Sequence, residues 1–200
     1  DGVPDVDFDG LAAINPDIVG WIYAPGNPIN YPVVQTDDNT TYLTKLFDLS
    51  GNGSGTIFMD MDDTAPGMVD QQTTLYGHHM NDGKMFKVVD NTLDQASFDA
   101  FPFVYYITPS ATYKLRPLMT AQVEDTYVDA RRANFTGEGE SLQAYLEDML
   151  AHAKAQADDA ATRIEDADQV MSLVTCAGEI IPRTTRAVMV LTVEEVTARQ

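Results

Sequence analysis

The sequence predicts a mainly β protein with about eight strands, arranged either as a closed barrel or as a sandwich. Three observations carry this prediction. Short runs rich in Val, Ile, Tyr, Phe and Thr follow one another along the chain. Clusters of Gly, Pro, Asn and Asp separate several of these runs, as turns between strands do. One long segment has helical periodicity instead, which makes it an insertion in a β framework.

The predicted strands are bounded by turn-forming residues, for example "APGNPIN" at 24–30, "LSGNGSG" at 49–55 and "HHMNDGK" at 78–84. The runs themselves are "GWIYA" (20–24), "YPVVQ" (31–35), "GTIFMD" (55–60), "TTLYGH" (73–78), "FVYYIT" (103–108), "ATYKLRPLMTAQV" (111–123), "VMSLVTC" (170–176) and "RAVMVLTVEEV" (186–196).

Two segments are predicted to be helical. Phe8, Leu11 and Ile14 recur at helical spacing and predict a short helix over about 7–15, which the Asn15–Pro16 step ends. Over about 139–157, apolar residues recur as in an amphipathic helix of about five turns, which we expect to lie as a lid over one end of the β framework. Its apolar positions are Leu142, Tyr145, Leu146, Met149, Leu150 and Ala153.

Length and composition limit the possible functions. With 200 residues, we expect a single domain over 1–200. The chain has 12 Lys and Arg against 31 Asp and Glu, and a net charge of −19 argues against binding to nucleic acid or anionic lipid. No apolar run approaches the roughly 18 residues of a membrane span, and "DGVPDVDFDG" is unlike a signal peptide. The single cysteine excludes an internal disulfide and a multi-thiolate zinc site.

Three residue types with catalytic chemistry stand at the ends of predicted strands. Cys176 follows "SLVT", the pair His78 and His79 follows "TLYG", and Arg186 precedes "AVMVL". A histidine beside a cysteine favours the nucleophilic thiolate, and an arginine stabilises a developing oxyanion. Adjacent histidines on an extended chain point to opposite faces, so one of the two faces any given site. The alternatives are a buried structural cysteine and an arginine that reaches solvent.

A metal site made from these histidines and "MDMDD" at 59–63 is disfavoured. The spacing of the two histidines is not the i, i+4 arrangement of a helical zinc site. We therefore expect no metal ligands, and we expect His152 to be a surface residue.

Several motifs resemble those of sortases, the cysteine transpeptidases of Gram-positive cell surfaces. They are "TLYGHHM", "SLVTC" and "TTRAVMVL", the last of which places Arg186 ten residues after Cys176. "INPDIVGWIYAPGNPINYPVVQTDDNTTYL", "GTIFMD", "GHHMNDGKMF" and the helical insertion resemble class B sortases more specifically. The resemblance covers about residues 8 to 195. It implies a closed eight-stranded sortase-type β-barrel, with a short N-terminal helix and a long helical insertion before the Cys strand.

The resemblance also implies the roles of individual residues. Cys176 is the expected nucleophile, His78 the proton-transfer group, and Arg186 the group that positions the substrate and stabilises the oxyanion. Family members often carry polar residues where this chain has Val174 and Ala177. The expected substrate-binding residues are Asn39, Tyr76, Leu43 and Thr175.

The implied reaction cleaves a C-terminal sorting motif after threonine through a thioester, and then transfers the acyl group to a cell-wall amine, with no metal or organic cofactor. Expected partners are surface-protein or pilin substrates and a peptidoglycan precursor or lysine amine as acceptor, with the enzyme a monomer. The resemblance places it at the extracellular face of the membrane, anchored by an N-terminal segment absent from this chain. Alternatives are a pilin-polymerising class B sortase, a cysteine hydrolase that uses water, and a catalytically silent peptide-binding module.

Overall fold

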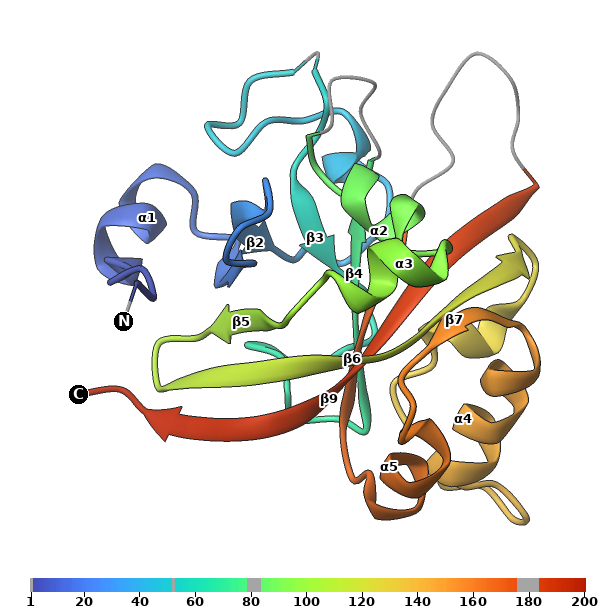
Figure 1. The fold of residues 1–200 in the computed structure, drawn as a ribbon. Helices are drawn as coiled ribbons and strands as arrows, with labels where there is room; N and C mark the ends of the chain where they lie inside the picture. Colours follow the sequence, from blue (N-terminus) through green and yellow to red (C-terminus); the bar gives the residue numbers. More distant parts are fainter. Residues whose placement is uncertain (1, 52, 79–83, 176–183) are drawn as a thin grey trace.

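The chain forms a closed ring of eight strands, with a ninth strand on its outside (Figure 1). The computed structural model describes residues 2–51, 53–78, 84–175 and 184–200. Within these ranges the ring order is β5-β1-β2-β3-β4-β8-β9-β6, and pairing of β6 with β5 closes it. The predicted closed eight-stranded barrel is therefore confirmed. The ring strands are β1 (Ile18–Tyr23), β2 (Asn30–Val34), β3 (Ile57–Met59), β4 (Gln72–Gly77), β5 (Val104–Ile107), β6 (Ala111–Glu124), β8 (Val170–Thr175) and β9 (Thr185–Ala198).

Side-chain alternation in β8 and β9 separates the barrel interior from a second apolar layer outside it. Leu173 and Met189 belong to the interior cluster, whereas Val174 and Val188 belong to the cluster on the other face. Successive side chains of a strand point to opposite faces of the sheet, so β8 is buried on both sides. This explains why its sequence reads as a nearly continuous apolar run.

The helical insertion expected over 139–157 is shorter than predicted and is divided. The helix α4 (Leu142–Ala151) begins at Ser141, whose hydroxyl accepts a hydrogen bond from the amide of Ala144 at 3.0 Å. It is followed by a strand, β7 (Ala153–Gln156), and by a second helix, α5 (Ala160–Asp166). The strand pairs with β6, so ladder hydrogen bonds replace the helical ones that the sequence pattern predicts.

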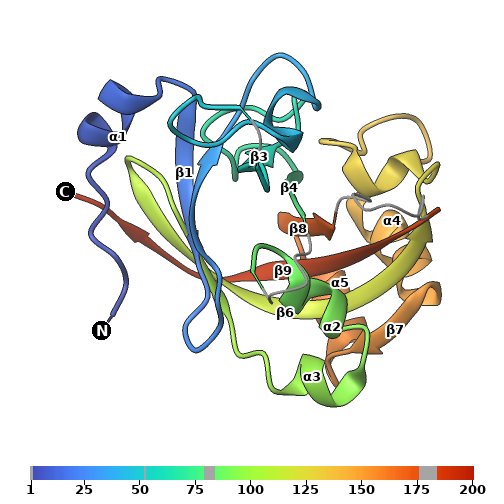
Figure 2. The same cartoon turned by 90° about the horizontal axis from the view of Figure 1, so that it is seen from above.

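The expected position of this insertion is also wrong, because α4 and α5 cover the side of the barrel and not its end. Leu142, Leu146 and Ile164 pack in one cluster with outward-facing residues of β6, β8 and β9. Figure 2 shows both helices beside β6 and β9, with α1 on the opposite side of the ring next to β1. The apolar stripe predicted for the insertion therefore makes the outer layer of the barrel wall.

The short N-terminal helix lies where it is expected, and other short helices were not predicted. In α1 (Phe8–Ile14) the Asp7 carboxylate accepts from the amide of Gly10 at 3.0 Å, and the helix ends at Asn15. The helices that the sequence pattern missed have only a few residues each, too few for a period of 3.6 to show. Besides α5, they are α2 (Lys87–Asn91), α3 (Gln95–Asp99), η1 (Thr41–Leu43) and η2 (Val128–Arg131).

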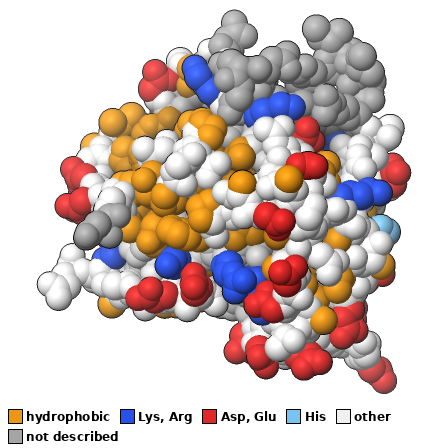
Figure 3. All heavy atoms as spheres, in the orientation of Figure 1, with side chains coloured by type: hydrophobic (Ala, Val, Ile, Leu, Met, Phe, Trp, Pro, Cys, Tyr) orange, Lys and Arg blue, Asp and Glu red, His pale blue; other side chains and the backbone are white. Residues whose placement is uncertain are grey.

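On the face shown in Figure 3, acidic side chains are scattered over the surface, while apolar atoms gather near β2 and β5. The scattered carboxylates agree with the solvated surface expected of a chain with net charge −19. In the part of the chain that the structure describes, no helix has the length and hydropathy needed to cross a bilayer.

The outer apolar layer predicts a large effect of truncating one buried residue of α4. Leu146 is fully buried, so Leu146→Ala should lower the free energy of unfolding by about 2–5 kcal/mol, through lost burial and the cavity left behind. The neighbouring Glu147 is exposed, and Glu147→Ala should stay within about 0.5 kcal/mol of the wild type. Urea denaturation of the three proteins measures both values. Equal stability of the two variants would show that α4 does not contribute to the core.

Candidate active site

The ends of β4, β8 and β9 meet at one edge of the barrel. Gly77 and Thr175 are partners in the parallel ladder between β4 and β8. The Thr175 hydroxyl accepts a hydrogen bond from the amide of Ala187 in β9 at 3.1 Å. Thr175 thus contacts two positions from distant parts of the sequence, Gly77 through the strand ladder and Ala187 through its hydroxyl.

Each of these three positions is the chain neighbour of a predicted catalytic residue. His78 follows Gly77, and Arg186 precedes Ala187. Cys176 follows Thr175 and lies outside the described residues. The sheet therefore brings together the segments that carry the predicted catalytic residues.

His78 is held by the backbone of η1. Its Nε2 contacts the carbonyl oxygen of Leu43 at 2.5 Å. A carbonyl oxygen only accepts, so Nε2 carries the proton in this contact. A Cβ added at Gly77 would lie 2.5 Å from Ile57 Cδ1 and 2.7 Å from Phe86 Cδ2, so close packing requires glycine before the histidine.

The η1 segment is itself anchored at its start and middle. The Asp38 carboxylate accepts from the amides of Thr41 at 2.8 Å and Thr40 at 3.0 Å, and these bonds lower the pKa of Asp38. The Tyr42 hydroxyl donates to Asp17 at 2.7 Å and accepts from Asn15 at 2.8 Å. Burial, followed by the bond to Asp17, raises the pKa of Tyr42 to about 12. The carbonyl of Leu43 therefore comes from a fixed segment.

A pocket of about 230 Å³ lies between η1, β4, the ends of β6 and β9, and the loop after β6. Its apolar lining comes from several strands, and its charged lining combines Arg131 and Arg186 with Glu124 and Asp125. Such a mixture suits an extended peptide with both apolar and polar groups. The lining residues are Asn39, Leu43, Phe58, Tyr76, Val123, Glu124, Asp125, Tyr127, Ala130, Arg131, Val174, Arg186 and Val188.

The predicted substrate-binding residues occupy different places. Asn39, Leu43 and Tyr76 line the pocket. Thr175 does not line it, because its side chain is buried and its hydroxyl binds the backbone of β9. His78 is next to the pocket through its contact with Leu43 and is not part of the lining.

Sequence reasoning missed Asp60, a buried carboxylate that binds two of the pocket residues. It accepts hydrogen bonds from the Tyr76 hydroxyl at 2.5 Å and from Asn39 Nδ2 at 3.1 Å. Burial raises the pKa of Tyr76, and the charge of Asp60 raises it further. Asp60 ends the predicted strand run "GTIFMD" and is part of "MDMDD", the disfavoured source of metal ligands, and neither pattern predicts a carboxylate that binds pocket residues. One signal for this role was available in the sequence. An aspartate directly follows the predicted buried strand "GTIFM", and the next predicted strand carries a tyrosine that could bind it.

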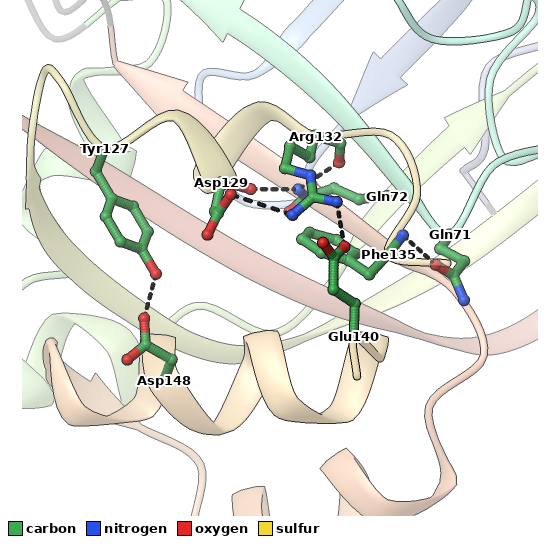
Figure 4. A network of polar contacts seen from close by, with 8 residues as sticks. All are labelled: Gln71, Gln72, Tyr127, Asp129, Arg132, Phe135, Glu140 and Asp148. Atoms are coloured by element: carbon green, nitrogen blue, oxygen red, sulfur yellow. Dashed lines mark hydrogen bonds and ion pairs between the residues drawn. The ribbon is translucent and has the colours of Figure 1, made fainter. Parts of the chain in front are cut away.

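The opposite wall is the loop after β6, and polar contacts hold it against β4 and α4 (Figure 4). Buried Gln72 donates through Nε2 to the carbonyl oxygens of Arg132 at 2.9 Å and Asp129 at 3.3 Å. The guanidinium of Arg132 bonds to the carboxylates of Asp129 and Glu140. In the same loop, the Tyr127 hydroxyl donates to Asp148 of α4. These contacts fix η2, which supplies Ala130 and Arg131 to the pocket.

Asp63, near the same strands, is a buried carboxylate with an incomplete set of partners. Its side chain accepts from the amide of Thr74 at 2.8 Å, while its other oxygen has no hydrogen-bond partner among the described residues. Burial raises the pKa of Asp63 from 3.8 to about 8; the bond to Thr74 opposes this shift and the charge of Asp60 adds to it.

The raised pKa of Asp63 predicts that the free energy of unfolding falls as the pH rises. Between about pH 4 and pH 8 the folded protein retains a proton on Asp63 that the unfolded chain has released. The stabilisation from protonated Asp63 is complete below about pH 4 and is lost as the pH rises through about 8, with a slope of about 1.4 kcal/mol per pH unit. Asp63→Asn cannot titrate and should remove this slope. Denaturation of both proteins from pH 4.5 to 8.5 measures the difference; parallel curves would contradict it.

Comparison with known proteins gives consistent matches across most of the chain. No protein-family model matches it. Sortase B of Staphylococcus aureus is 30% identical over 185 residues, which cover 92% of this chain and 72% of that protein. The structure of the Staphylococcus aureus sortase B–substrate complex has a TM-score of 0.82 at 30% identity, covering 93% of this chain and 83% of that one. A structure of sortase B complexed with triglycine has a TM-score of 0.80 at 29% identity, with coverages of 96% and 86%.

The sequence identity and the shared barrel agree on one relationship, and the chain therefore belongs to the sortase B family of cysteine transpeptidases.

Proposed function

We propose that the protein cleaves a C-terminal sorting motif after threonine and transfers the resulting acyl group to an amine. In this proposal Cys176 is the nucleophile, His78 transfers protons, and Arg186 stabilises the oxyanion. The observation that supports it best is the contact between Gly77, Thr175 and Ala187, the chain neighbours of these three residues.

The first half-reaction forms the thioester. The Cys176 thiolate attacks the threonine carbonyl carbon, and the carbonyl oxygen becomes an oxyanion beside the Arg186 guanidinium. The carbon–nitrogen bond then breaks, and protonated His78 gives its proton to the departing amine. The bond from Nε2 to Leu43 orients the imidazole for transfer through Nδ1.

The second half-reaction reverses these roles. A neutral amine attacks the thioester carbon, His78 accepts the proton that the amine loses, and the carbon–sulfur bond breaks to restore the thiolate. A metal ion is not required in this scheme, since Arg186 supplies the positive charge. We propose the amine of a peptidoglycan precursor as the acyl acceptor, in line with the sortase B structure solved with triglycine. A lysine of a pilin subunit is the alternative acceptor.

The pocket suits the peptide half of the reaction. The structure of the Staphylococcus aureus relative has been solved with a substrate. In this proposal the peptide substrate binds in the pocket that Asn39, Leu43 and Tyr76 line. Sortases act at the outer face of the cell membrane, and we propose the same location for this protein, with an anchoring segment outside this chain.

Intact-mass spectrometry with sorting pentapeptides tests the covalent step. The wild type should gain the mass of an acyl fragment on Cys176, and an added glycine peptide should discharge it. Cys176→Ala should show no adduct, and His78→Ala should form it about 100- to 10,000-fold more slowly because general acid–base catalysis is lost.

The matched control for His78 is the exposed His152, and His152→Ala should react at the wild-type rate. An adduct in Cys176→Ala would exclude the proposed nucleophile. If every peptide leaves the wild type unmodified, the protein is a peptide-binding module or reads only folded subunits. Discharge that is independent of the added amine would identify a hydrolase, and discharge by lysine alone would favour pilin polymerisation.

A further inference from the structure

Asp60 is a buried carboxylate beside the pocket, and both side chains that donate hydrogen bonds to it line the pocket. It follows β3 directly and is 1% exposed. Its carboxylate accepts from the Tyr76 hydroxyl at 2.5 Å, from Asn39 Nδ2 at 3.1 Å and from the backbone amide of Asp62 at 2.9 Å. A buried carboxylate is costly unless hydrogen bonds satisfy it, and here three donors converge on it.

The first of these contacts fixes the strand that leads to His78. Tyr76 lies in the last part of β4, which ends at Gly77, and His78 is the next residue of the chain. The Tyr76 ring packs against Phe58 with a centroid distance of 5.1 Å, and its hydroxyl is held by Asp60. Ring and hydroxyl together set the shape of the pocket next to the histidine.

The second contact fixes the segment that orients the imidazole. Asn39 is held at both ends of its amide, since Nδ2 donates to Asp60 and Oδ1 accepts from the amide of Met61 at 2.8 Å. Two residues later η1 begins, and the carbonyl of Leu43 at its end contacts His78 Nε2. A continuous set of contacts therefore runs from Asp60 to the imidazole.

We propose that Asp60 is a positioning residue for the transpeptidation, which holds His78 in its reactive orientation through Asn39 and η1, and the pocket wall through Tyr76. This inference rests on the proposed function. Asp60 touches neither the peptide nor the reacting atoms in this role. A carboxylate suits the position because it only accepts hydrogen bonds, and each of its three neighbours donates one.

The variant Asp60→Asn tests this role with almost no change in volume. Tyr76 and Asn39 donate to one oxygen of Asp60 and the amide of Asp62 donates to the other, so the NH2 group of the introduced side chain would face a donor in either orientation and at least one of the three contacts is lost. The rate of thioester formation at saturating peptide should fall on the order of 10- to 100-fold, since small misplacements of a catalytic group have effects of this size. The displacement of His78 should lower kcat, and the shift of the pocket wall at Tyr76 should raise KM by a smaller factor. Asp62→Asn is the matched control, since the Asp62 side chain is exposed.

The double variant Asp60→Asn with Asn39→Asp restores a donor–acceptor pair with the roles exchanged. At saturating peptide the double variant should recover most of the lost kcat, while its KM stays altered because Asn39 lines the pocket. Asn39→Asp alone should be as slow as Asp60→Asn, because two carboxylates then face each other. Thermal unfolding of all variants is measured in parallel. The inference is overturned if Asp60→Asn is partly unfolded at the assay temperature and this accounts for its loss of kcat. It is also overturned if Asp60→Asn turns over within twofold of the rate of Asp62→Asn.

A second readout does not depend on turnover. Nitrogen-15 NMR of labelled histidine reports which ring nitrogen carries the proton, and the signal of His78 is assigned by its loss in His78→Ala. The wild type and Asp62→Asn should show the Nε2-protonated form, and Asp60→Asn should show a mixture of tautomers. If the wild type makes no thioester, the proposed function fails. The spectrum then still shows whether Asp60 holds the imidazole of His78 in one tautomer. An unchanged spectrum in Asp60→Asn would refute this role.

Discussion

The position of β8 between β4 and β9 is the constraint on which the site depends. It pairs in parallel with β4 and antiparallel with β9, and both of its faces are buried. A slip of one residue would exchange the inner and outer apolar sets, which is costly when both faces pack against cores. The register that aligns Gly77 with Thr175 is therefore strongly specified, and with it the edge where the segments that carry the predicted catalytic residues begin.

The pocket beside this edge has walls that are set before any peptide binds. On one side the buried carboxylate of Asp60 satisfies donors from two pocket residues. On the other side buried Gln72 donates to two carbonyls of the η2 loop and accepts from the Ser172 hydroxyl of β8 at 2.7 Å. Both walls are tied to strands of the barrel, so folding itself orders them and the pocket is preformed.

The helical insertion shows where a local pattern is insufficient. Over α4 the apolar period of the sequence agrees with the structure, because that stripe packs on the barrel wall. Beyond it, Ala153, Ala155 and Ala157 continue a helix-favouring composition, yet 153–156 is a strand. Pairing with β6 supplies backbone hydrogen bonds that the intrinsic preference of alanine does not outweigh, and no local signal marks β6 as the partner.

The sequence by itself determined the mainly β class, most strand positions, α1, and the candidate roles of Cys176, His78 and Arg186. These follow from alternation, turn residues and motifs, which are properties of neighbouring positions in one chain segment. Only the tertiary structure decided that Asp60 binds Asn39 and Tyr76, that the Thr175 hydroxyl faces β9, and that α4 covers the barrel wall. The reason is physical: a local pattern says which face of a segment is apolar, whereas its partners are chosen by the closure of the whole sheet.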